Sequence, residues 1–192
     1  MVAHINLRKV YLTGLLLFVS FSGPLLGSTP HFDIELPPSK AEWQHFNKMN
    51  PSQLRALWQF QAERGRGSLA AWAWQWRLGW IRHCALAAKL GVCPQILDQG
   101  LIDEAMVVRA ESAQVLGQLS RGRPDKALVK KLATAYSDPR NSRNGSPLFV
   151  CDRIIAALQT IGDPYAIETA TKLANKHPLT AQYWSKIQRQ KP

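Results

Sequence analysis

The side chains with the most evident chemistry in this sequence are its three cysteines. Cys84 and Cys93 lie on either side of Gly91, a position at which the chain is expected to turn back. A disulfide needs Cα atoms about 4.4–6.8 Å apart, so a bridge between the two cysteines is possible if the turn is tight. Cys151 could instead pair with Cys93 or stay free. Because the number of cysteines is odd, one thiol is left over in either case.

The sequence lacks the other arrangements that perform chemistry. Apart from His4 near the N-terminus, its histidines are scattered at His31, His45, His83 and His177, and they have neither the i, i+4 spacing nor the Cys-x-x-Cys partner of a zinc site. There is no Gly-x-Ser-x-Gly motif and no glycine-rich phosphate loop. Asp103 and Glu104 are adjacent, so they point to different sides of a helix and suit the stabilisation of its N-terminus. We expect no metal, no cofactor and no enzymatic activity.

Binding of an anionic partner is the chemistry that the composition favours. The chain of 192 residues has 24 Lys and Arg against 13 Asp and Glu, which gives a net charge of +11. An excess of cations attracts anions, and the same charge can also be spread over all surfaces and serve solubility. The partner-binding candidates are arginines of the predicted repeat helices and of one polar loop, namely Arg109, Arg140, Arg143 and Arg153.

Aromatic residues provide a second candidate surface. Four of the seven tryptophans fall in one short segment. Three of these are spaced by four and share a helix face, where they either pack against the N-terminal helices or form a platform that stacks a ring: Trp72, Trp76 and Trp80. Trp74 points elsewhere, so it is the tryptophan that we expect to be exposed. Trp74 and Arg77 complete the set of partner-binding candidates.

Residues 1–28 are predicted to be a secretory signal peptide. Arg8 and Lys9 provide a basic start, Val10–Phe21 is almost wholly apolar, and small residues follow just before position 29. The apolar run is shorter than the roughly 20 residues of a membrane span. We therefore expect cleavage, no transmembrane span in the mature chain, and export to the periplasm or the extracellular space. An uncleaved N-terminal anchor is the alternative.

Two segments precede the repeats. Residues 29–50 are predicted to be an extended, proline-containing lead-in followed by a first helix over Ser39–Met49. Residues 51–91 are predicted to be Trp-rich N-terminal helices. The first covers Pro51–Glu63, and the second, the longest of the chain, covers Leu69–Leu90. Ser or Asn stands just before each helix, and both residue types are good N-terminal caps.

Residues 92–192 repeat a helical phrase. The phrase occurs at Val108–Leu119 and again at Val150–Ile161, each time followed by a proline-containing turn and a second amphipathic helix. Three prolines precede helices at intervals of 30 and then 40 residues: Pro94, Pro124 and Pro164. The longer interval is explained by a helix-free loop over Ser137–Pro147. A fixed period with one insertion indicates a stacked-helix array, which Ala181–Gln190 would close as a capping helix.

The repeat residues resemble a known family. The pattern Val-Arg-x-x-x-Ala-x-x-Leu-Gly at Val108–Gly117 resembles the HEAT repeat, in the short form of phycobilisome-lyase-type arrays. Ile-Gly-Asp-Pro at positions 161–164 looks like the turn between its helices, and Ile81-Arg82 would begin a degenerate earlier copy. One departure is Cys151, which stands where the family's helix usually carries Arg. The resemblance implies an all-α fold, a right-handed α-α superhelix (HEAT-like helical repeat array) with an N-terminal helical cap.

HEAT arrays of this kind usually bind proteins, so the resemblance implies an exported scaffold or adaptor. We expect a monomer that binds a protein partner, acidic in character, through its helical array and the 137–147 loop. One alternative is a cell-envelope-surface factor that binds anionic polymer or lipid. Another is a nucleic-acid-binding protein similar to HEAT-like alkylpurine glycosylases. The signal segment argues against nucleic acid, and no motif of that family matches a position here.

Overall fold

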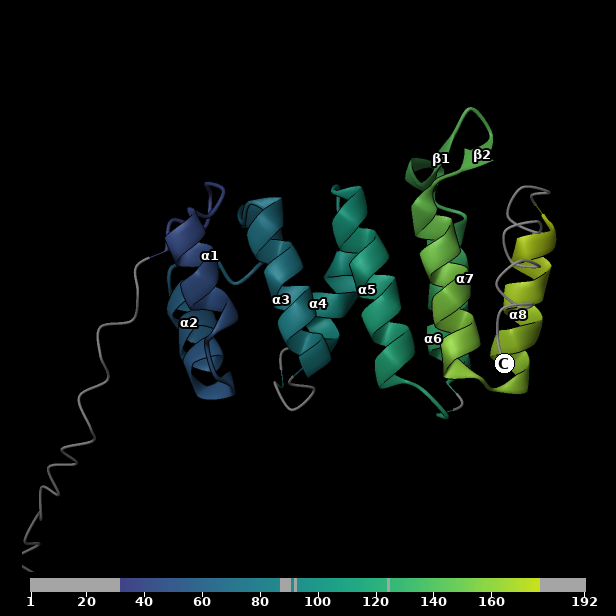
Figure 1. The fold of residues 1–192 in the computed structure, drawn as a ribbon, viewed down its shortest axis with the longest axis horizontal. Coiled ribbons are helices and arrows are strands. Elements are labelled where there is room, and N and C mark those ends of the chain that lie inside the picture. Colours follow the sequence, from purple (N-terminus) through teal and green to yellow (C-terminus); the bar gives the residue numbers. More distant parts are fainter. Residues whose placement is uncertain (1–31, 87–90, 92, 124, 177–192) are drawn as a thin grey trace, which may run out of the picture.

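The computed structural model describes residues 32–86, 91, 93–123 and 125–176. The predicted signal peptide and the predicted closing helix over Ala181–Gln190 lie outside these ranges. The described part is mainly helical, with its helices arranged side by side along one direction (Figure 1), and none of its helices is long and apolar enough to cross a membrane. In chain order, the elements are α1 (Lys40–Asn47), α2 (Pro51–Glu63), η1 (Leu69–Ala71), α3 (Trp74–Leu86), α4 (Cys93–Leu101), α5 (Met106–Leu119), α6 (Lys126–Tyr136), η2 (Pro139–Asn141), β1 (Ser142–Arg143), β2 (Ser146–Pro147), α7 (Phe149–Ile161) and α8 (Pro164–Asn175).

The first two helices start where the sequence predicts. Ser39 caps α1 and Asn50 caps α2, and each cap forms a capping box with a residue three positions later. In α1, the Ser39 backbone N–H donates to Glu42 Oε2 over 2.8 Å. In α2, the Asn50 backbone N–H donates to Gln53 Oε1 over 2.9 Å. Such a cap contributes about 1 kcal/mol to the stability of a helix.

The prediction of one long helix over Leu69–Leu90 is wrong at the start of the helix. The predicted end lies outside the described residues. Ser68 caps only the short turn η1, and α3 begins afterwards as a separate helix. Between them, Trp72 is extended, with φ −97° and ψ 145°. The Ala73 backbone N–H donates to Ile34 O over 2.6 Å. This bond to the N-terminal lead-in replaces the hydrogen bond that a continuous helix would form.

Tryptophan rings form the core of the N-terminal half and do not form an exposed platform. Trp72, Trp76 and Trp80 are all fully buried. Trp80 packs edge-on against Trp58 of α2, with ring centroids 5.2 Å apart. Trp76 meets Phe46 of α1 in the same way, at 5.4 Å. Edge-to-face contacts of this kind are favourable beyond the area they bury, and here they fasten α1 and α2 onto α3.

Helices α3 to α8 follow one another in sequence order along the molecule (Figure 1). The helices α3, α5 and α7 form one layer, in which α5 packs against both neighbours. The helices α4 and α6 lie behind this layer, and α8 packs on both α6 and α7. The two repeated phrases form most of α5 and α7, as predicted. Their apolar faces meet in a shared core that includes Ala113, Ile154, Ile155 and Leu158.

The helices α5 and α7 approach each other closely at Gly117, near the end of the first phrase. A Cβ atom at this position would lie 2.6 Å from Ala157 Cα on α7, a distance that real Cβ contacts do not reach. Glycine therefore lets the two helix backbones approach each other, and the Leu-Gly pair near the end of the phrase has a packing role.

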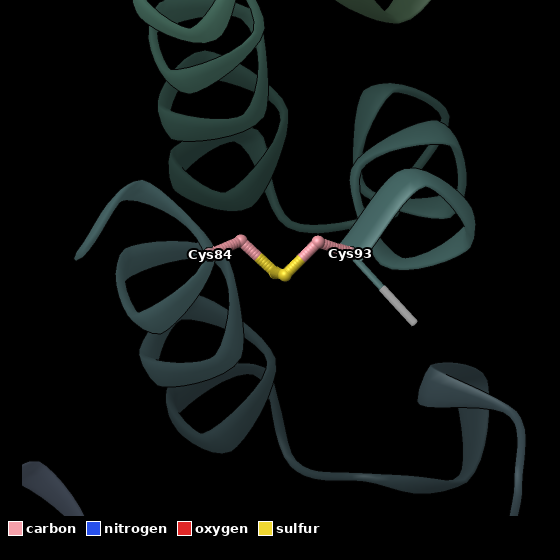
Figure 2. Close-up of a disulfide and its surroundings, with 2 residues drawn as sticks. All are labelled: Cys84 and Cys93. Atoms are coloured by element: carbon pink, nitrogen blue, oxygen red, sulfur yellow. A yellow bond between two sulfur atoms is a disulfide. The ribbon is translucent and has the colours of Figure 1, made fainter. Parts of the chain in front are cut away.

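A disulfide joins α3 to α4 (Figure 2). The Cα atoms of Cys84 and Cys93 are 5.5 Å apart, within the range that a bridge requires. Both residues are buried, one in the last turn of α3 and the other at the start of α4. Cys151 is free and buried in α7, where its Sγ lies 3.3 Å from Asn141 O. Burial raises the pKa of the Cys151 thiol to about 11.

The loop predicted over Ser137–Pro147 has regular structure of its own. It contains the short helical turn η2, and the strands β1 and β2 then pair antiparallel, with Arg143 opposite Ser146. Asn144 and Gly145 have φ of 52° and 74°, the positive values that a two-residue type I′ turn needs. The resulting hairpin projects beyond the ends of the helices (Figure 1).

Candidate partner-binding surface

One edge of the array contains the starts of α3, α5 and α7. Arg77 of α3 donates from Nη2 to Asp103 Oδ1 in the loop before α5, over 2.9 Å. Arg109 of α5 donates from Nε to Asn141 Oδ1 in the segment before α7, over 2.8 Å. The β1–β2 hairpin lies at the same edge (Figure 1). We name this surface the hairpin edge and define it as the first turns of α3, α5 and α7 with residues 102–105 and 138–148.

Three arginines from three different elements hold the loop 102–105. Arg109 donates from Nη1 to the carbonyl oxygens of Asp103 and Glu104, over 2.6 and 2.8 Å. Arg140, at the base of the hairpin, donates from Nη1 to Ile102 O over 3.0 Å. The bond from Arg77 of α3 to the Asp103 carboxylate, described above, provides the third contact. The loop is therefore held by α3 on one side and by α5 and the base of the hairpin on the other. The donor groups that hold it are directed to acceptors within the chain.

Arg109, which was predicted to contact a partner, is only 2% exposed in this structure. Its Nη2 donates to Arg140 O over 3.1 Å, and its Nε bond goes to Asn141, which is itself fully buried. Burial lowers the pKa of Arg109, and the nearby carboxylates of Asp138 and Asp103 act in the opposite direction. The guanidinium joins two loops of the array and presents no donor at the surface.

Arg77 and Arg140, which were also predicted to bind a partner, have acceptors within the chain. The Arg77 side chain is mostly buried and donates from Nη1 to Trp72 O over 2.7 Å. Arg140 is half-exposed and pairs with Asp138, with Nη2 2.6 Å from Oδ2. Hydrogen bonding to the Arg140 guanidinium lowers the pKa of Asp138 to about 2. Both arginines thus position the loop 102–105 and the base of the hairpin.

The other three predicted partner residues are exposed. Trp74, the first residue of α3, is 43% exposed, as expected for the one tryptophan of its segment that points elsewhere. Arg143 lies beside the hairpin turn, and its side chain forms no ion pair with a described residue. Arg153 is exposed on α7 and donates from Nη1 to Gln114 Oε1 on α5, over 2.7 Å. These three side chains remain available at or beside the hairpin edge.

The most exposed apolar side chain of the hairpin edge belongs to Ile102, which is 65% exposed. It lies between two hollows. One hollow, of about 300 Å³, is lined by residues of η1, α3 and α4, among them Leu69, Ala70 and Gln99. The other, of about 370 Å³, is lined by residues of α4 and α6, among them Leu101, Thr134 and Ala135. An apolar side chain with a concave surface on each side suits a protein contact.

Two further apolar side chains are exposed at this edge, Val107 near the start of α5 and Phe149 at the start of α7. Trp74 occupies the matching place on α3. Single exposed apolar residues are common, whereas several on one edge mark an interaction surface. The sequence patterns did not indicate Ile102, Val107 or Phe149, because apolar residues near a helix start are normally assigned to the core.

Among the residues that the structure describes, no three His, Cys, Asp or Glu side chains lie where they could hold an ion together. His83 is buried, and its Nε2 lies 2.9 Å from Phe46 O. Burial lowers the pKa of His83, so the neutral ring is favoured in the core. His31 and His177 lie outside the described residues.

No protein-family model, no curated protein and no solved structure significantly matches this chain. Its function is therefore inferred from the residues of its own surface.

Proposed function

We propose that this chain is an exported, HEAT-like scaffold that binds a protein partner at the hairpin edge and carries out no catalysis. The observation that carries this proposal is the presentation of Ile102. Three arginines fix the loop 102–105, and the exposed Ile102 side chain lies between two hollows. An apolar anchor that is already rigid before binding loses little entropy in a complex, which favours affinity.

The matching roles of Arg77 and Arg109 support a HEAT-like repeat. Each donates to a carbonyl five residues earlier, Trp72 O and Glu104 O respectively. Each also reaches the loop before the next helix of its layer. This match favours Arg77, not Arg82, as the arginine of the first repeat. We propose three helix pairs, α3–α4, α5–α6 and α7–α8, wound as a right-handed α-α superhelix that α1 and α2 cap.

Two features support export. The N-terminal 28 residues have the basic, apolar and small-residue regions of a secretory signal. The disulfide between Cys84 and Cys93 is a bond of oxidising compartments and is rare in the cytosol. We propose cleavage near residue 28, followed by delivery of a monomer to the periplasm or the extracellular space.

The geometry of the hairpin edge favours a partner with apolar side chains at the centre of its contact. The expectation of an acidic partner rested on arginines, of which Arg77 and Arg109 donate within the chain. Arg140, Arg143 and Arg153 are the predicted cations that stay exposed, and the exposed Glu104 lines the hollow beside η1. We propose that the partner fills the hollows with apolar groups and places its carboxylates opposite the hairpin.

Site-specific photo-crosslinking in cells that export the chain tests this surface. A photoreactive amino acid replaces Ile102 in one variant. In the matched control it replaces Gln118, which is exposed at the far end of α5. We expect a discrete protein adduct from position 102 and none from position 118. The absence of a discrete adduct at position 102, or the same adducts from both positions, contradicts the proposal.

A further inference from the structure

The edge opposite the hairpin edge has a different composition. The helices α5 and α7 end there, and α6 and α8 begin there (Figure 1). The Gly122 backbone N–H donates to Ile161 O over 2.9 Å, so the turn after α5 lies against the end of α7. Lys126 Nζ lies 5.9 Å from the centre of the Tyr165 ring, which brings the starts of α6 and α8 together. We name this surface the basic edge and define it as residues 86, 120–123, 125–130 and 161–167.

Four cations of the basic edge are exposed, and none forms an ion pair with a described residue: Arg121, Arg123, Lys126 and Lys130. All 13 Asp and Glu residues of the chain lie in the described ranges. The two that lie within the basic edge act as helix caps. Asp125 accepts from Leu128 N over 3.0 Å, and Asp163 accepts from Tyr165 N over 3.0 Å. The charge of this edge therefore faces solvent, unlike that of Arg77 and Arg109.

Exposed apolar side chains flank these cations. Leu86, at the end of α3, is 84% exposed, and Ile167, in the first turns of α8, is 47% exposed. Because α3 runs in the same direction as α5, its end lies at the basic edge (Figure 1). Cations beside exposed apolar side chains are typical of surfaces that bind anionic lipid. The cations contact the phosphate groups, and the apolar side chains enter the boundary between headgroups and acyl chains.

We propose that the basic edge binds a membrane surface that contains anionic phospholipid. A nucleic-acid duplex would satisfy the four cations and leave Leu86 and Ile167 in water, whereas a lipid surface accommodates both kinds of side chain. This inference does not depend on the protein partner, because it uses the opposite edge of the array. A chain bound in this way presents the hairpin edge away from the membrane.

Co-sedimentation of the full chain with vesicles tests this proposal. The vesicles contain phosphatidylcholine alone or phosphatidylcholine with an equal share of phosphatidylglycerol. We expect binding to the anionic vesicles to be at least about tenfold tighter and to weaken with added salt. The variant R121Q/R123Q/K126Q/K130Q binds the anionic vesicles at least about tenfold more weakly, since each cation near such a surface contributes about fivefold.

A matched variant removes the same charge elsewhere. K40Q/K48Q/R55Q/K176Q changes four exposed cations outside the basic edge, and its binding stays within about threefold of the wild type, as expected for a local contact. The variant L86S weakens vesicle binding and leaves binding to soluble polyphosphate unchanged. Equal losses in the two quadruple variants, equal binding to both kinds of vesicle, or an unchanged L86S overturns the proposal. So does binding to a DNA duplex as tight as to anionic vesicles.

Discussion

Arg109 is the residue on which the geometry of the hairpin edge depends most. A buried cation is tolerated when its donors are satisfied. Here four oxygen atoms accept from one guanidinium, two from the loop before α5 and two from the segment before α7. Because these acceptors belong to two loops, one side chain positions both of them.

Replacing Arg109 by Met removes these hydrogen bonds and keeps most of the apolar stem. We expect R109M to lower the free energy of unfolding by about 2–4 kcal/mol, because buried acceptors, Asn141 Oδ1 among them, lose their partner. Urea denaturation measures this change. The matched variant R153Q, at an exposed arginine, should stay within about 0.5 kcal/mol of the wild type. Equal stability of R109M and the wild type would show that Arg109 does not hold the loops.

The buried thiol of Cys151 should make the free energy of unfolding depend on pH. Burial raises the pKa of its thiol from 9.0 to about 11 in the folded chain. The thiol is protonated in both states below pH 9, and above it the unfolded chain loses the proton first. The free energy of unfolding should therefore fall between pH 9 and pH 11. The variant C151A should show a smaller fall over this window when both proteins are unfolded in urea. Parallel pH profiles of the two proteins would refute this prediction.

The sequence could not indicate that Arg109 holds two loops together. The acceptors of Arg109 lie 5, 6, 31 and 32 residues away, and three of them are backbone carbonyls, which carry no sequence signal. An arginine in a basic chain is therefore assigned to the surface. The sequence did indicate the pairing of Cys84 with Cys93 as one possibility, because this bridge depends only on a short local turn.

Among the elements, those defined by local signals were predictable. The bounds of α2 agree with the prediction, because its apolar periodicity and its Asn50 cap are local signals. Those of α5 and α7, which have no side-chain cap, differ from the repeated phrases only at their starts. The break before α3 depends on the bond from Ala73 to Ile34, which no periodicity reveals. The hairpin had a signal in Asn144-Gly145, which is typical of a type I′ turn. The polar residues around that pair masked the strands.

The disulfide fastens two neighbouring elements, α3 and α4. Its loss should lower the free energy of unfolding by roughly 2–3 kcal/mol, because the bridge restricts a short loop in the unfolded chain. Thermal or urea unfolding of C84S/C93S measures the change. A reductant should destabilise the wild type by a similar amount and leave the double variant unchanged. A reductant that affects both proteins equally would contradict this assignment.

At the scale of the whole molecule, the two edges of the array have different surfaces. At the hairpin edge Arg77 and Arg109 turn inward and apolar side chains are exposed, whereas at the basic edge four cations face solvent. The net charge of +11 indicated an anionic partner without indicating where it binds. The structure separates a surface with exposed apolar side chains from a charged one, and they lie at opposite ends of α5 and α7.

The most direct test of this account is the affinity for the protein captured at position 102. With that partner purified, the dissociation constant is measured for the wild type, for I102D and for R143Q/R153Q. We predict that I102D raises the dissociation constant by at least about 30-fold, as an interface anchor does, and that R143Q/R153Q raises it by less than about tenfold. An unchanged affinity of I102D together with a large loss in R143Q/R153Q would contradict the account.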